Sequence, residues 1–204
     1  MSGSISKDVR LLAAIAYGEA STADDPQEIG GIAFAVANRC RAWDGKTVSE
    51  LRSADPNYSY AWDGSNARFN KLMRTPDGEI DLNPAVKLAV VWAQKALAND
   101  GPDPSNGAFW WDGLDFRTNY ANHPKVRDGF KWGSASDNIF GVREKRREVI
   151  VRWKIRNKKT GQIVDGGERG RYDSVWISTA AHGSTVFWQH NPDYLKASGG
   201  KAFR

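Results

Sequence analysis

One glutamate stands where the sequence can hold a reactive carboxyl. Glu19 directly follows Gly18, at the end of an apolar run with helical spacing over residues 9–16. Glycine takes positive φ without steric cost, so Gly18 predicts that this helix stops near Tyr17. A carboxyl beside an apolar stripe at a helix C-terminus favours its protonated form. Glu19 is therefore a candidate general acid; the alternative is a solvated glutamate near a helix end.

Cleavage of a glycosidic bond also needs a group that stabilises an oxocarbenium-like centre. The acidic candidates for this second role are Asp24, Asp25, Glu28, Asp63, Asp112 and Asp115. Asp25-Pro26-Gln27-Glu28 has the pattern of an N-cap with a capping box, so Asp25 and Glu28 already have a local structural role. The sequence does not single out the partner carboxylate among the other four.

Other chemistries have weaker support in the sequence. His123, His182 and His190 are not in a metal-binding spacing, so we expect structural histidines and no metal or cofactor. The motif Gly-x-Ser-x-Gly is absent, which argues against an α/β-hydrolase elbow. Cys40 follows the apolar face of a predicted helix. We therefore expect a buried free thiol, and a single cysteine excludes an internal disulfide.

Three sequence blocks occur in an informative order. They are Tyr17-Gly18-Glu19-Ala20, Asn57-Tyr58-Ser59-Tyr60-Ala61-Trp62 and Asp103-Pro104-Ser105-Asn106-Gly107-Ala108-Phe109-Trp110-Trp111. Together they resemble the SleB-type cell wall hydrolases, a family similar in fold to lysozymes and lytic transglycosylases. Asn57 and Tyr58 replace the Gln and Phe of the family pattern. The resemblance covers about half of the chain, from Val9 to Trp111.

The resemblance implies an enzyme that cleaves the peptidoglycan glycan as a muramidase or a lytic transglycosylase. Glu19 would be its general acid and base, with no cofactor, and the substrate-binding residues would be Tyr58, Ser59, Trp62, Asn106, Trp110 and Trp111. In lytic transglycosylases one Glu acts first as acid and then as base, and the sugar's N-acetyl group supplies the stabilisation. The lack of an obvious partner carboxylate favours that mechanism slightly, and Ser21 or Ser59 would contact the N-acetyl group or orient the acid.

The expected fold is α+β and lysozyme-like, with a mainly helical core and a small antiparallel β lobe in the C-terminal third. Capping patterns predict helices that begin after Ser6, Asp25, Thr47 and Asn83, and a further helix is expected over Asn66–Met73. Gly30 and Gly31 lie within the second helix and predict close packing against another element. The stretch from residue 99 to about 139 is loop-rich, and long irregular stretches in compact domains are often functional.

From Glu148 to Asn157 apolar and basic residues alternate with period two, which is typical of a strand. The turn Asn157–Gly161 and a returning segment predict a hairpin within one small antiparallel sheet over residues 143 to about 190. We expect a single domain over 1–204, with a helical catalytic lobe (1–142), a β-sheet lobe (143–190) and a tail (191–204).

The chain of 204 residues is basic, with a formal net charge of +5 and an isoelectric point near 9.3. Excess positive charge favours anionic partners such as nucleic acid, anionic cell wall polymers or anionic membrane surfaces. The basic residues at the predicted hairpin are Arg143, Lys145, Arg146, Arg147, Arg152, Lys154, Arg156, Lys158 and Lys159. They support two alternatives to an enzyme, a cell-wall-binding protein and a nucleic-acid-binding protein with Trp153 as a stacking group.

If the protein is an enzyme, we expect it to be a monomer and to have no nucleic acid partner. Its basic strand would then contact the carboxylates of peptidoglycan stem peptides.

No apolar run approaches the length of a membrane span, and the N-terminus lacks the pattern of a Sec signal. We therefore expect synthesis in the cytoplasm and action on the cell wall in the periplasm, after non-Sec export or lysis. A phage lysin and a secreted antibacterial effector both fit. An injected effector would also need a cognate inhibitor protein.

Overall fold

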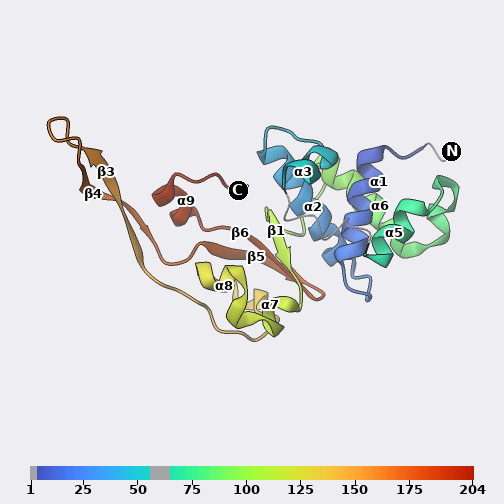
Figure 1. Cartoon of the computed structure of the whole chain (residues 1–204). Helices are drawn as coiled ribbons and strands as arrows, with labels where there is room; N and C mark the ends of the chain where they lie inside the picture. The colour runs from blue at the N-terminus through green and yellow to red at the C-terminus, as the bar shows by residue number, and fades with distance from the viewer. Residues whose placement is uncertain (1–3, 56–64) are drawn as a thin grey trace.

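The computed structural model describes residues 4–55 and 65–204 and has a mixed α+β fold. The helical body, a four-stranded sheet and a projecting β-hairpin follow one another across the molecule (Figure 1). The α+β class agrees with the sequence-based expectation.

The helical body is organised around α1. Its elements are α1 (Lys7–Glu19), α2 (Pro26–Ala42), α3 (Val48–Ala54), α5 (Ala67–Arg74), η2 (Asp77–Leu82) and α6 (Pro84–Ala98). Helix α1 packs against α2, α3, α5 and α6, and residues 11–17 are all buried. Because four helices surround it, the end of α1 is held in a fixed place.

Each of the predicted helix starts is a real N-cap. In each case the side chain of the capping residue accepts a hydrogen bond from a backbone N–H in the first turn, at Ser6, Asp25, Thr47, Asn66 and Asn83. The capping box predicted at Thr47 is present, with Glu50 bonded back to the Thr47 N–H. The one predicted at Asp25 is only half formed, because the side chain of Glu28 turns inward instead.

Glycines and a cysteine in α2 lie in the core as predicted. A Cβ atom on Gly30 would fall within 2.7 Å of the Trp92 indole, and one on Gly31 would overlap the ring of Phe187. Cys40 is buried, and burial raises the pKa of its thiol to about 11. Close approach of α2 to both α6 and the sheet therefore requires these two glycines.

The four-stranded sheet has the order β1-β6-β5-β2. Its strands are β1 (Trp110–Asp112), β2 (Phe130–Lys131), β5 (Trp176–His182) and β6 (Thr185–His190). The β1–β6 and β5–β6 pairs are antiparallel, whereas β2 pairs with β5 in parallel. The prediction of one antiparallel sheet within residues 143–190 is therefore wrong in extent. Two of the four strands come from the stretch that was expected to be loop.

Short helices connect these strands and cover a second core. They are α7 (Asp115–Thr118), η3 (Tyr120–Asn122), α8 (Pro124–Asp128) and η4 (Ala135–Asp137). A further helix, α9 (Pro192–Ser198), follows β6 and packs against β4. The second core is mainly aromatic, with Phe116, Phe130 and Trp188 fully buried in mutual ring contact. Most tryptophans of the described residues are thus structural, as the composition suggested.

Strands β3 (Val149–Arg156) and β4 (Ile163–Tyr172) form a separate two-stranded sheet. Among the described residues they pair with no other strand, and they extend away from the body (Figure 1). The predicted alternation and turn are confirmed. However, the hairpin is not part of the main sheet, and its base packs against the body at α9. Within residues 4–55 and 65–204, no helix has the length and apolar character needed to cross a membrane.

Candidate active site

Glu19 is the last residue of α1, two residues beyond the predicted helix end. Gly18 is helical and does not adopt positive φ, so the reason given for it above is wrong. Its role is steric. A Cβ atom there would lie 3.0 Å from Asn66 Nδ2 and 3.0 Å from Phe69 Cβ. Gly18 therefore allows the start of α5 to approach the end of α1.

Asn66 joins these two helices. Its Nδ2 donates to the Gly18 carbonyl at 2.9 Å, and its Oδ1 accepts from the N–H groups of Arg68 and Phe69, each at 3.0 Å. Arg68 adds a second link, because its Nε donates to the Tyr17 carbonyl at 2.7 Å. The C-terminal carbonyls of α1 thus gain partners from α5, which holds Glu19 at a defined position.

The carboxyl of Glu19 is half-buried, and burial raises its pKa above the ordinary value. Side-chain hydrogen bonds with Trp111 and Asn66 oppose this shift, and the negative charge of Asp115 adds to it. Oε1 is buried and has no hydrogen-bond partner among the described residues. A carboxyl in this environment holds its proton to higher pH than an exposed glutamate, as a general acid requires.

The two neighbouring tryptophans of β1 lie on opposite sides of the strand. Trp111 reaches the Glu19 carboxyl, whereas the Trp110 ring lies 4.9 Å from the Trp176 ring and 4.7 Å from the His190 ring. Successive side chains of a strand point to opposite faces, so the two cannot share one site. Trp111 is therefore adjacent to Glu19, and Trp110 is separated from it by the strand.

Trp110 lines a pocket of about 450 Å³ on its own side of the strand. The lining residues are Arg39, Trp43, Ala54, Asp55, Trp110, Trp176, His190 and Arg204. Arg39 and Asp55 form a buried ion pair there. Burial also lowers the pKa of His190 to about 4, so its imidazole is neutral near pH 7. This pocket does not contain Glu19.

Asn106 lies in a loop that is tied to α2. Asp103 accepts hydrogen bonds from the Ser105 N–H at 2.8 Å, the Gly107 N–H at 2.9 Å and the Asn38 amide at 2.8 Å. Asn106 has positive φ (51°), and its side chain donates to the Thr179 carbonyl at 3.1 Å. The Asp-Pro-Ser-Asn-Gly block therefore has a structural role in fastening this loop to α2 and β5.

Glu28 is fully buried and joins three segments of the chain. Its carboxylate accepts from the Ser21 N–H (3.1 Å) and Oγ (2.5 Å), from the Ser184 N–H (3.0 Å) and from Thr185 Oγ1 (2.8 Å). The loop after α1 and the β5–β6 turn are thus both fixed to α2. The hydroxyl of Ser21 is used in this network, and the four donors leave Glu28 no catalytic role.

The other acidic candidates differ in how they are engaged. Asp25 caps α2, Asp24 pairs with Arg68 at 2.6 Å, and Asp112 pairs with Lys125 at 2.8 Å. Asp115 is the most exposed of the described candidates, and its charge acts on Glu19. Among the predicted residues, Tyr58, Ser59, Trp62 and Asp63 lie outside the described part of the chain.

Asp112, Asp115 and His123 place one ligand atom each within 4.8 Å of the others, which is a spacing that can hold a cation. Lys125 competes with that role, because its ammonium lies 2.8 Å from Asp112 Oδ2. His123 is buried, and it also caps α8, where Nδ1 accepts from the Lys125 N–H at 3.3 Å. The cluster is accounted for as an internal ion-pair network beside the second core.

Sequence reasoning missed two sets of contacts that hold the segments around this site, those of Asn66 and those of Glu28. Asn66 was predicted only as the start of a helix, although Asn is also able to donate through its amide while it caps. The inward turn of Glu28 had no sequence signal, because its partners Ser184 and Thr185 are more than 150 residues away.

The chain matches no family model, no curated protein and no solved structure.

Proposed function

We propose that this protein cleaves glycosidic bonds in the peptidoglycan glycan, as a muramidase or a lytic transglycosylase, with Glu19 as general acid and base. The observation that carries the proposal is the Glu19 carboxyl, which is half-buried at the end of α1 with its pKa raised by burial and with Trp111 and Asn66 bonded to it. The three sequence blocks in order support the same activity.

In the proposed reaction, protonated Glu19 gives its proton to the oxygen of the leaving sugar as the glycosidic bond breaks. The resulting carboxylate then takes a proton from the incoming nucleophile. That nucleophile is water in hydrolysis and a hydroxyl of the same sugar in transglycosylation. Trp111 and Asn66 stabilise the carboxylate between these steps, since both hydrogen bonds favour the charged form.

Among the acidic candidates in the described part of the chain, Asp115 is best suited to assist this chemistry. Its side chain is exposed and, within this part of the chain, makes only a long contact with His123 (3.7 Å), whereas Asp24, Asp25, Glu28 and Asp112 are engaged in caps, closer ion pairs or buried hydrogen bonds. In a hydrolase Asp115 would orient the attacking water, and in a lytic enzyme it would be dispensable. The variant Asp115→Asn therefore distinguishes the two mechanisms.

The test compares the parent with Glu19→Gln on purified sacculi, with soluble products identified by mass spectrometry. Gln is close in shape but has no acidic proton, so we expect a loss of solubilisation of about 100-fold or more. Glu79→Gln is the matched control, because Glu79 is exposed on η2. Transglycosylation gives products lighter by one water than those of hydrolysis.

Two results would reject the assignment of Glu19. One is sacculus solubilisation by Glu19→Gln at the rate of the control. The other is parent products cut at amide bonds instead of glycosidic bonds. Sacculus binding by the parent without any soluble product would instead favour the non-catalytic alternative.

The lysozyme-like fold, action in the periplasm after non-Sec export or lysis, and inhibition by a cognate protein belong to the same proposal. The fold rests on the sequence blocks, the route on the N-terminal sequence pattern, and the inhibitor on the case of an injected effector.

A further inference from the structure

The β3–β4 hairpin, here called the arm (Val149–Tyr172), exposes an unusual amount of apolar surface. Ten large hydrophobic side chains of the described residues are exposed, and half of them are on the arm. They are Ile150, Trp153, Ile155, Ile163 and Val164, with exposed fractions from 44% to 65%. A concentration of exposed apolar side chains in one element marks an interaction site.

The arm also carries all of the net charge of the protein. It contains seven Lys and Arg residues against two Asp and Glu residues, a net charge of +5. The remainder of the chain contains twenty-two of each sign. Lys154 pairs with Asp165, and Arg171 pairs with Glu168. The partner of the arm must therefore be anionic.

Three of the five exposed apolar side chains, Trp153, Ile155 and Val164, share one face of the arm. The register pairs Ile155 with Val164 and Lys154 with Asp165, so apolar and charged pairs alternate across the ribbon. Trp153 lies on the same face as Ile155, and a Cβ atom on Gly166 would contact both of them. The opposite face carries Arg152, Lys154 and Arg156, together with Ile163, which pairs with Arg156. The outer part of the arm thus has one mainly apolar face and one mainly basic face.

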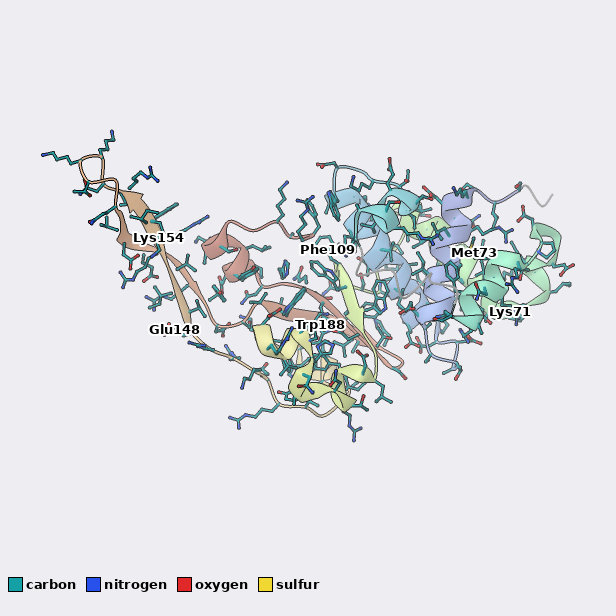
Figure 2. The ribbon with its side chains drawn as sticks, in the orientation of Figure 1. Lys71, Met73, Phe109, Glu148, Lys154 and Trp188 are labelled. Atoms are coloured by element: carbon teal, nitrogen blue, oxygen red, sulfur yellow. The ribbon has the colours of Figure 1, made fainter. Side chains whose placement is uncertain are left out.

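The body covers the apolar face only at the base of the arm. There Gly170 packs against α9, where a Cβ atom would lie 3.0 Å from Ala197 Cβ. Beyond that point the side chains stand in open space around the strands, with Glu148 near the base and Lys154 toward the tip (Figure 2). The eight residues of β3 span about 26 Å at about 3.3 Å each, so the tip reaches well past the body.

We propose that the arm docks on the surface of an anionic phospholipid bilayer. The face with Trp153, Ile155 and Val164 would lie at the boundary of the acyl chains, where Trp side chains are favoured. Arg and Lys side chains are long enough to extend from the opposite face and the turn to the phosphate groups. A bilayer surface is a partner that offers an apolar layer and negative charge side by side.

A dissolved polyanion fits these observations less well. Proteins that bind nucleic acid strands place aromatic and basic side chains along the same groove. On the arm, the row of Arg152, Lys154 and Arg156 is on the face opposite Trp153, whose ring is stacked with Arg169 at 4.8 Å. A polyanion bound along that row would leave Ile155 and Val164 in water. The proposal is independent of the activity assigned to Glu19.

The test is co-sedimentation of the full chain with vesicles of phosphatidylcholine and phosphatidylglycerol in equal parts, at about 0.1 M salt. Two arm variants are compared with the parent. The apolar variant is the double substitution Trp153→Ser and Ile155→Ser. The basic variant is the triple substitution Arg156→Ser, Lys158→Ser and Lys159→Ser. The matched controls change exposed residues of the body. Leu82→Ser with Leu114→Ser is the control for the apolar variant, and Lys71→Ser with Arg74→Ser and Arg117→Ser is the control for the basic variant. Circular dichroism verifies the fold of each variant.

We expect the parent to bind these vesicles and not pure phosphatidylcholine. Each arm variant should lose about tenfold or more in affinity, and the controls should stay within about twofold. The proposal is overturned if the parent does not bind, or if the Trp153 and Ile155 variant binds like the parent. It is equally overturned if sacculi or nucleic acid bind the arm, and the vesicles do not.

Discussion

At the scale of single residues, the molecule uses its acidic side chains for very different purposes. Glu28 is fully buried and accepts four hydrogen bonds, so its charge is compensated. Glu19 has a buried oxygen without such a partner among the described residues, and burial dominates its pKa. The first is a structural carboxylate. The second is the proposed proton donor, and it lowers the stability of the fold once it ionises.

That contrast predicts that Glu19→Gln stabilises the protein at neutral pH. A carboxyl whose pKa is raised in the folded state contributes stability at low pH, and loses it as pH rises through the raised pKa. Gln removes the ionisation. The free energy of unfolding of the variant should therefore exceed that of the parent at pH 7, and the difference should shrink toward pH 4. Urea unfolding at both pH values measures it, and a gain that is equal at both would contradict a raised pKa.

Part of this site was predictable from local sequence. The end of an apolar helix beside Glu19 indicated desolvation correctly, because burial is a local consequence of the stripe on α1. The role of Gly18 was not predictable, since it depends on Asn66, which is 48 residues away. The separation of Trp110 from Trp111 follows from strand geometry. It would have been predicted if β1 had been recognised as a strand.

At the scale of elements, the packing of α2 determines where the sheet lies relative to Glu19. Gly31 faces Phe187 on β6, and Phe187 pairs with Trp111 on β1. The distance between helix and sheet therefore sets the position of Trp111, which bonds to Glu19. A single glycine of α2 thus bears on the position of the proposed catalytic carboxyl.

Gly31→Ala is expected to destabilise the protein by about 1–3 kcal/mol, because the added methyl group overlaps the fully buried ring of Phe187. The greater helix propensity of Ala, worth about 1 kcal/mol, opposes this only in part. Gly78→Ala is the control, since Gly78 has no atom within 4 Å of the added Cβ and does not have positive φ. Thermal unfolding of both variants measures the difference. A Gly31→Ala variant as stable as Gly78→Ala would show that the helix and sheet can move apart.

The elements differed in how well the sequence predicted them. Each of these helices begins at a residue whose side chain caps a backbone N–H two or three residues further along the chain. The helix starts could therefore be predicted from short stretches of sequence. Strands β1 and β2 have only three and two residues, too few for a period to be detected. Their partners in β5 and β6 lie at least 46 residues further along the chain, and only the folded chain brings them together.

At the scale of the whole molecule, a neutral body carries a basic arm that adds little to its core. None of the buried hydrophobic side chains of either core cluster comes from β3 or β4. The arm can therefore be altered without loss of the fold, which is what an element dedicated to a partner requires.

Replacing residues 152–167 with a short turn should leave the melting temperature within a few degrees of the parent. The contact of Gly170 with α9 is kept, and no core residue is removed. The formal net charge falls from +5 to +1, so the variant should elute earlier from a cation exchanger. Differential scanning calorimetry gives the melting temperature. A fall of more than about 10 °C would show that the arm supports the body.

The buried thiol of Cys40 can be used to detect rare openings of the helical body, because a reagent can reach it only when α2 moves away from its neighbours. Alkylating reagents attack the thiolate, and a pKa of about 11 together with burial in α2 keeps that species scarce and shielded in the native fold. Each modified molecule therefore marks a moment when α2 had come away from its neighbours. Since the same helix carries Glu28 and Gly31, the rate of labelling reports how often the framework around Glu19 comes apart.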